Sequence, residues 1–226
     1  RDLFAKQPLA KMRGFLPKHF SFNVDGGRCD TCKGEGEQVV EMQFLADVHL
    51  TCESCGGKRF KEEVLEVQYK GKSVFDILDM SVDDAIDFFD GDKVIKQAIQ
   101  PLQDVGLGYI KLGQSSNTLS GGEAQRVKLA SFLGKGKGIG HVLFIFDEPT
   151  TGLHFHDIKK LLASFNALIE QGHSLIVIEH NTDVIRSADW VIDLGPEAGD
   201  MGGTLVYAGV PQGLKRVKNS YTGAFL

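Results

Sequence analysis

Two carboxylates, Asp147 and Glu148, directly follow the apolar run 142–146. A continuous apolar run that ends in carboxylates favours a central parallel strand buried on both faces, and open α/β sheets bind ligands beyond the carboxyl ends of such strands. At this place Asp147 could hold Mg²⁺ directly or through water, and Glu148 could orient and deprotonate an attacking water. The alternative is a polar turn before Pro149 without chemistry.

A histidine ends the next apolar run, 174–179. His180 could donate a hydrogen bond to a phosphate at the same edge of the sheet. A single histidine at a strand end is also a common structural residue. Its place between Glu179 and Asn181, after an apolar strand, favours the functional interpretation.

The sequence 119–126 predicts a helix start with unusual chemistry. Ser120 is a good N-cap, and Glu123 three residues later completes a capping box. Gly121 and Gly122 fall in the first turn, where each costs about 1 kcal/mol relative to alanine. A helix whose first N–H groups contact a phosphate would need such residues, because no Cβ then blocks the anion. The alternative is an ordinary capped helix.

Four cysteines form two close pairs, Cys29-x-x-Cys32 and Cys52-x-x-Cys55, with nineteen residues between them. This spacing is typical of a structural zinc site in which sulfur fills all four positions. The intervening segments 38–44 and 47–50 predict a hairpin that brings the pairs together, with His49 pointing along a strand. Two disulfides or four buried thiols are the alternatives.

The composition limits the function of the chain. With 226 residues and a net charge of −5, the chain as a whole is not an electrostatic binder of nucleic acid. No apolar run approaches the ~20 residues that span a bilayer, and the sequence contains no secretory signal. The chain begins within a predicted helix at 2–5, so we expect a piece of a longer protein. Residues 1–20 form either a solvated basic face or a basic strip with aromatics facing nucleic acid.

No complete phosphate loop is found in the sequence. Gly71-Lys72-Ser73 would need a glycine at position 66, which is Glu66, so we interpret 70–73 as a turn. The glycine-lysine segment 134–138 follows a helix instead of a strand, and we expect a mobile loop there.

The remaining periodicity predicts an α/β fold, a sheet with helices on its faces. We expect strands at 64–69, 142–147, 174–179, 190–194 and 204–208, a glycine-rich turn at 199–203, and helices at 82–89, 92–105, 155–171 and 182–187.

The order of these features resembles the ABC-type ATPases. Leu-Ser-Gly-Gly-Glu at 119–123, the strand ending in Asp147-Glu148, Thr-Thr-Gly-Leu-His at 150–154 and the strand ending in His180 occur at plausible spacing. Together with the four cysteines, the segments 20–29, 57–59, 118–126, 177–181 and 220–223 are similar to the UvrA family, the damage-recognition ATPases of bacterial nucleotide excision repair.

The resemblance implies a fold and a place in the family. The chain would be the C-terminal part of the second ABC ATPase cassette, beginning after its phosphate loop. Residues 1–133 would be a helical signature region carrying the zinc hairpin module (about 21–62), and residues 134–226 a portion of the α/β ATPase core.

The resemblance also implies roles. Ser120, Gly121 and Gly122 would act on a nucleotide bound by another cassette, while Asp147, Glu148 and His180 would act on the nucleotide of their own. ATP and Mg²⁺ would bind the full-length protein, structural Zn²⁺ would bind the cysteines, and the chain alone would lack ATPase activity.

The implied partners are damaged duplex DNA, UvrB and a second copy of the full-length protein, in the cytoplasm and with no membrane. Three alternatives differ in class or role. They are a zinc-bearing interaction module without an ATPase role, a UvrA-like drug-resistance paralogue, and a transporter cassette, which leaves the zinc site unexplained.

Overall fold

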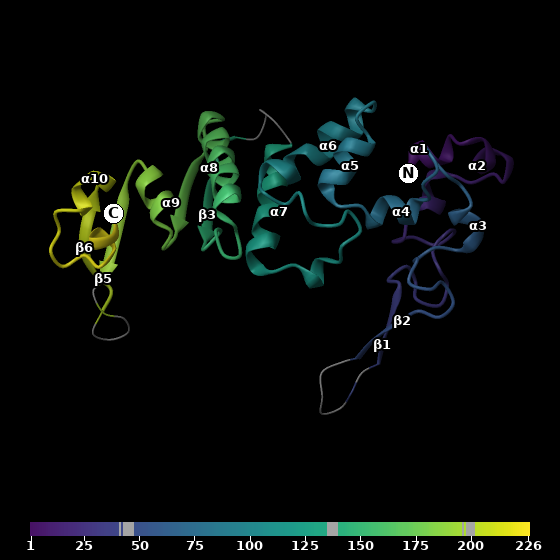
Figure 1. The fold of residues 1–226 in the computed structure, drawn as a ribbon, viewed down its shortest axis with the longest axis horizontal. Coiled ribbons are helices and arrows are strands. Elements are labelled where there is room, and N and C mark those ends of the chain that lie inside the picture. The colour runs from purple at the N-terminus through teal and green to yellow at the C-terminus, as the bar shows by residue number, and fades with distance from the viewer. Residues whose placement is uncertain (41, 43–47, 135–139, 196, 198–201) are drawn as a thin grey trace. The chain divides into compact units, whose positions relative to one another are not determined.

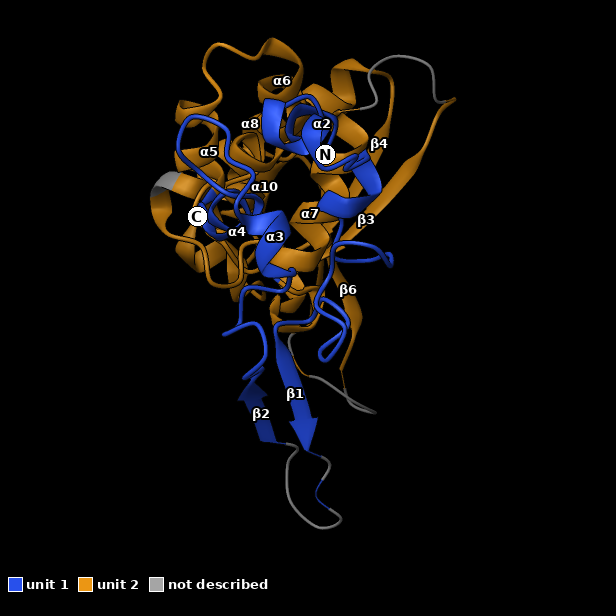
Figure 2. Ribbon diagram, turned by 90° about the vertical axis from the view of Figure 1, so that its right-hand side faces the viewer, with its two compact units in different colours: residues 1–81, 111–114 blue, residues 82–110, 115–226 orange. Residues whose placement is uncertain are grey.

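The computed structural model describes residues 1–40, 42, 48–134, 140–195, 197 and 202–226. Figure 1 shows the helices and strands along the chain. Contacts between residues divide the chain into two compact units, which Figure 2 shows in different colours. Unit 1 comprises residues 1–81 and 111–114, and unit 2 comprises residues 82–110 and 115–226. The functional division expected at residue 133 stays a prediction.

Unit 1 is built from short elements around a small core. Its helices are α1 (Asp2–Ala5), α2 (Pro8–Met12), η1 (Pro17–Phe20), α3 (Glu62–Leu65) and α4 (Val74–Asp79), and its strands are β1 (Glu37–Val40) and β2 (Val48–Thr51). The ring of Phe20 stacks on Phe4 at 5.4 Å and meets Phe15 edge-on at 6.2 Å. Phe20 is buried in this core, so its ring is not part of an exposed basic strip.

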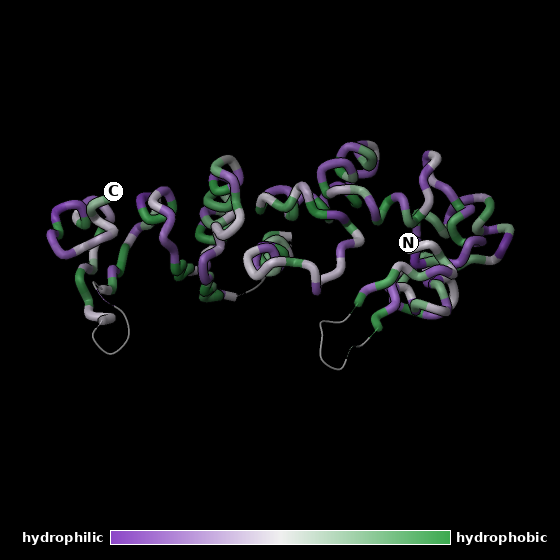
Figure 3. The backbone as a smooth tube through the Cα atoms, turned by 60° about the horizontal axis from the view of Figure 1, so that its bottom comes forward, coloured by the Kyte–Doolittle hydropathy of each residue, from purple (hydrophilic) through white to green (hydrophobic). Residues whose placement is uncertain are grey.

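The predicted hairpin is present as the antiparallel pair β1–β2, in which Gln38 lies opposite Leu50 and Val40 opposite Val48. All eight residues of the two strands are exposed. Both strands are hydrophobic next to the grey trace and mixed farther from it (Figure 3). Residues 41 and 43–47 of the predicted strands lie outside the described residues.

The strand predicted at 64–69 is wrong, because Val64 and Leu65 belong to helix α3, which ends there, and of residues 66–69 only Tyr69 forms a β-bridge, with Lys72. Val64 and Val67 are both fully buried, and this spacing of three residues places both side chains on one side of a helical turn. Their apolar types had indicated a strand, but burial against the rest of unit 1 decides the conformation. The turn at 70–73 is confirmed, since the backbones of Tyr69 and Lys72 exchange two hydrogen bonds.

Unit 2 contains most of the helices and strands expected from the sequence. Its helices are α5 (Val82–Phe88), α6 (Lys93–Asp104), η2 (Ser116–Thr118), α7 (Gly121–Leu133), α8 (Phe155–Glu170), α9 (Thr182–Ser187), α10 (Pro211–Leu214) and η4 (Thr222–Phe225). Its strands are β3 (Leu143–Asp147), β4 (Ser174–Ile178), β5 (Val191–Gly195) and β6 (Thr204–Gly209). The loop expected at 134–138 falls almost wholly outside the described residues, as does most of the turn at 199–203.

Strands β3 and β4 form a parallel pair in which Asp147 lies opposite Ile178. One face is covered: Phe144 packs edge-on against Phe132 of α7 at 5.0 Å, and Phe146 packs against Phe165 of α8 at 4.9 Å. The other face is open, with Ile145 65% exposed. The expected burial on both faces is therefore wrong for this chain, because no described segment covers the second face.

Strands β5 and β6 pair with each other and run antiparallel, with a register shift between Asp193 and Leu194. In the described part of the chain they form a separate two-stranded sheet. The expectation of one sheet with helices on its faces is met only in part, because α7 and α8 cover one face of the β3–β4 pair and β5–β6 is a separate sheet. The fold class is mixed α/β with a parallel strand pair.

Among the described residues, no helix combines the length and the apolar character that crossing a bilayer requires.

Candidate metal centre and candidate nucleotide site

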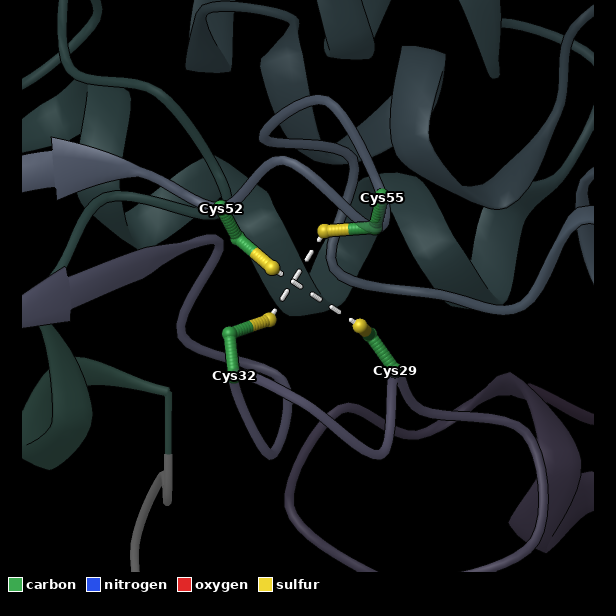
Figure 4. Close-up of side chains that lie close together, drawn as sticks. All are labelled: Cys29, Cys32, Cys52 and Cys55. Carbon is green, nitrogen blue, oxygen red and sulfur yellow. Dashed lines mark hydrogen bonds between the residues drawn. The ribbon is translucent and has the colours of Figure 1, made fainter.

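The four cysteines of unit 1 converge on one point (Figure 4). Their sulfur atoms all lie within 4.8 Å of one another, with 4.0 Å between Cys29 and Cys52 and 3.7 Å between Cys32 and Cys55. These separations are far longer than the ~2.05 Å of a disulfide, so the alternative of two disulfides is excluded. Three of the four thiols are buried.

Tight turns that contain glycine hold each pair of cysteines so that their thiols face the centre of the cluster. Gly34 has φ +94°, and a Cβ there would stand 2.1 Å from the carbonyl oxygen of Phe22. The backbone N–H of Gly36 donates to the Cys32 sulfur at 3.3 Å. The two loops are joined by backbone bonds, from Cys29 N–H to the Arg59 carbonyl and from Cys52 N–H to the Gly36 carbonyl.

Two thiols of the cluster, those of Cys29 and Cys55, have pKa values shifted in opposite directions. Burial raises the pKa of Cys29, but hydrogen bonds from the backbone of Cys32 and Thr31 and from neighbouring thiols outweigh it and bring this pKa down to about 7. Burial raises the pKa of Cys55 to about 12, and hydrogen bonds to the other thiols add to this increase. A first thiolate is therefore readily formed, and a cation is needed to hold four together.

The donor set fits zinc. A tetrahedral site with Zn–S bonds of about 2.3 Å separates the sulfurs by about 3.8 Å, close to the separations observed here. His49 is not part of the cluster, because its ring pairs with Glu37 across the hairpin at 3.2 Å. Four sulfur ligands leave no open position, so a bound zinc would stabilise unit 1 and would not act on a substrate.

In unit 2, the carboxylates predicted from the sequence lie at the carboxyl end of β3. Asp147 is its last residue, and Glu148 begins the turn that follows. Both side chains are exposed. Glu148 has φ +45°, a left-handed conformation that a non-glycine residue rarely adopts. Its backbone N–H donates to the carbonyl of Ile178 at 2.9 Å, which fixes the turn to the end of β4.

His180 meets Glu148 at this edge of the strand pair. Its Nε2 atom lies 3.7 Å from Oε1 of Glu148, and both side chains are open to solvent. The structure thus brings three of the residues selected from the sequence, Asp147, Glu148 and His180, to the carboxyl ends of two adjacent parallel strands. Their roles toward a nucleotide stay predictions.

The sequence interpretation did not include Glu179 among the site residues. Its carboxylate accepts backbone N–H groups of Thr150, His180 and Asn181, at 2.8, 3.1 and 3.2 Å. The signal available in the sequence was an acidic residue between an apolar strand and the candidate histidine.

The predicted helix start is present at α7. The Ser120 hydroxyl accepts from Glu123 N–H at 3.3 Å, and the Glu123 carboxylate accepts from Ser120 N–H at 2.8 Å. Tyr109 donates its hydroxyl to Glu123 at 2.6 Å. This bond, together with the backbone bond from Ser120, lowers the pKa of Glu123. The tip at Ser120 and Gly121 is exposed.

The two glycines of the tip have different surroundings. A Cβ at Gly121 would meet open space, which is compatible with a phosphate approaching the helix end. A Cβ at Gly122 would lie 3.3 Å from the carbonyl oxygen of Thr151 and 3.4 Å from Nη1 of Arg126. Gly122 therefore also permits α7 to lie close to the turn after β3.

Comparisons with known proteins extend these observations. No family model matches the chain. The UvrABC system protein A of Agrobacterium fabrum is 56% identical over 226 residues, all of this chain and 23% of that protein. The same protein of Aquifex aeolicus is 56% identical over 226 residues, again all of this chain and 24% of that protein.

A solved structure, the crystal structure of UvrA2 from Deinococcus radiodurans, matches all of this chain and 28% of that chain, with a TM-score of 0.89 and 46% identity. The chain spans about a quarter of the length of the curated relatives it matches.

The fold and the site define a mixed α/β chain that combines a four-cysteine cluster with a polar edge on a parallel strand pair. The resemblance to the UvrA family that the sequence predicted is confirmed over the whole chain by relatives named UvrABC system protein A.

Proposed function

We propose that the chain is a segment of a damage-recognition ATPase of bacterial nucleotide excision repair, the C-terminal part of its second ABC cassette. The observation that carries this proposal is the pair of Glu148 and His180, 3.7 Å apart at the carboxyl edge of parallel strands. The 56% sequence identity to UvrABC system protein A, in an alignment over all 226 residues, supports the same assignment.

The strand-end residues would serve the nucleotide of their own cassette. Asp147 would hold Mg²⁺, which neutralises phosphate charge when ATP is bound. Glu148 would accept a proton from a water whose oxygen attacks the γ-phosphorus, while the bond to the bridging oxygen breaks and ADP leaves with the electron pair. His180 would donate a hydrogen bond to a γ-phosphate oxygen.

The tip of α7 would serve a second nucleotide. Its exposed Ser120 and Gly121, with Gly122 behind them, would contact the phosphates of ATP held by a phosphate loop elsewhere in the full-length protein. The positive end of the helix dipole and free N–H groups suit such an anion. The full-length protein would form a homodimer.

The four-cysteine site would hold structural zinc, and the hairpin module beside it would work near damaged duplex DNA. Loading of UvrB and a cytoplasmic location belong to the same proposal. Lys58 is the better residue for a DNA-binding test, because Arg59 already donates to the Gly113 carbonyl at 2.7 Å and lies over the Phe22 ring. Charge reversal at exposed Lys58 should weaken binding of damaged DNA across a salt titration.

The decisive experiment measures ATP hydrolysis by the full-length protein. We expect Glu148→Gln to lower kcat about 100-fold or more while ATP still binds. Glu170→Gln, at the exposed end of α8, is the matched control and should leave kcat unchanged. We expect no turnover from the isolated chain; turnover that disappears with Glu148→Gln would overturn this part of the proposal.

A zinc-bearing interaction module without an ATPase role is the second candidate, favoured by the closed four-sulfur geometry. It predicts that ATP leaves the melting temperature of the full-length protein unchanged. A paralogue devoted to drug resistance would bind ATP but would not discriminate damaged from undamaged DNA.

A further inference from the structure

The carboxylate of Glu179 joins two loops of unit 2. Oε1 accepts the N–H of Thr150, in the turn after β3, at 2.8 Å. Oε2 accepts the N–H groups of His180 and Asn181, in the loop after β4, at 3.1 and 3.2 Å. One side chain thus satisfies three backbone donors from two separate segments.

Each of these bonds is next to a residue of the candidate site. Thr150 follows Glu148 by two positions, and the backbone of Glu148 is already bonded to Ile178. Asn181 is the N-cap of α9 and accepts from Asp183 and Val184 N–H, so the loop that carries His180 is fixed on its far side as well. The Glu179 carboxylate links these two anchored segments through hydrogen bonds to their backbones.

A carboxylate suits this position because both of its oxygens accept hydrogen bonds. A glutamine would turn its NH₂ group toward an N–H donor on one of the two sides. It would lose at least one bond and place two donors face to face. The contact therefore depends on the chemical type of residue 179 and not only on its size.

We propose that Glu179 is a positioning residue for ATP hydrolysis, which sets the separation of Glu148 and His180 by holding the backbones of their two loops. The proposal rests on the proposed ATPase function. It assigns Glu179 no contact with nucleotide. An error of about 1 Å in the placement of reacting groups can cost about 100-fold in rate, so such a link is worth preserving.

The first test compares steady-state ATP hydrolysis by the full-length protein and its variants. We expect Glu179→Gln to lower kcat by about tenfold to 100-fold, with the KM for ATP changed less than about threefold. Glu170→Gln is the control and should match the wild type. A Glu179→Gln protein that is folded and has a kcat within about twofold of wild type would overturn the proposal.

A second test asks whether Glu179 acts through His180. In a His180→Ala background, Glu179→Gln should cost much less than it does in the wild type, because the group it positions is gone. Fully additive losses would show that residue 179 affects turnover by another route, and would contradict the proposal.

Two further measurements keep the outcomes separate. If the wild type hydrolyses no ATP, or Glu148→Gln retains turnover, the proposed function itself fails. If Glu179→Gln does not fold, Glu179→Asp replaces it, since its shorter side chain cannot span both loops. For Glu179→Asp we expect the same loss of kcat and faster hydrogen exchange in peptides that contain Thr150 and His180. A wild-type kcat or unchanged hydrogen exchange in this variant would contradict the proposal.

Discussion

The guanidinium of Arg126 donates a hydrogen bond from Nη1 to the carbonyl oxygen of Pro149 at 3.0 Å, and the arginine is only 1% exposed. It lies on the buried side of α7 with Leu129 and Ala130. The contact joins the helix that opens with Gly121 to the turn that carries Glu148. A charged residue thus occupies a core position.

We predict that Arg126→Ala destabilises the protein by about 3 kcal/mol or more, because it leaves a large cavity and a buried carbonyl without its donor. Thermal unfolding followed by circular dichroism measures the effect. Lys128→Ala, at an exposed position of the same helix, should stay within about 0.5 kcal/mol of wild type. Equal melting temperatures for the two variants would contradict the packing described here.

The glycines of the α7 tip should separate stability from activity. Gly121→Ala should stabilise the helix by up to about 1 kcal/mol, because its Cβ meets open space. The same Cβ should lower ATP turnover of the full-length protein if a phosphate approaches there. Gly122→Ala should gain less stability, since its Cβ crowds Thr151. An activity loss for Gly122→Ala alone would argue against phosphate contact at Gly121.

Removal of one thiol should abolish metal binding. Cys52→Ser places a weak ligand at a fully buried position, and we expect its zinc content to fall from about one per chain to near zero. Elemental analysis and the number of thiols that react with a modifying reagent check this result. Glu53→Gln, exposed between Cys52 and Cys55, is the control that should retain the metal and the protected thiols.

The Tyr109–Glu123 bond should make stability depend on pH. Because the pKa of Glu123 is lowered below its ordinary 4.5, its contribution is present above that value and is lost as pH falls through the lowered pKa. Tyr109→Phe should therefore cost below about 1 kcal/mol at pH 7 and less at pH 3.

Chemical denaturation at the two pH values measures the effect of Tyr109→Phe. Tyr221→Phe, at an exposed position, should change neither value. A cost for Tyr109→Phe that is the same at both pH values would show that the Glu123 charge does not contribute.

Local patterns were sufficient to predict much of the fold. The spacing of apolar residues predicted α8 and β4, and the capping box predicted the start of α7. The spacing of the cysteines predicted that their sulfur atoms form one cluster. Each of these depends on residues close in sequence, or on a ligand geometry that limits the choices.

The wrong or missing predictions depend on distant contacts. Val64 and Val67 form part of a helical turn because unit 1 buries them, which no local pattern indicates. The antiparallel pairing of β5 with β6 depends on which strands become neighbours in the folded chain, and a local sequence pattern does not determine this. Arg126 and Glu179 were overlooked because their types suggest surface residues, whereas Arg126 bonds the backbone of Pro149 and Glu179 that of Thr150, both distant in sequence.

The positive φ of Glu148 has a consequence for protein engineering. Glycine, or asparagine to a lesser degree, adopts that backbone angle at lower cost, so a library screened for thermostability alone should enrich either residue at position 148. Such a screen would discard the carboxylate that we propose accepts a proton from the attacking water. Heat-resistant clones recovered in this way should be checked for catalysis before any other property.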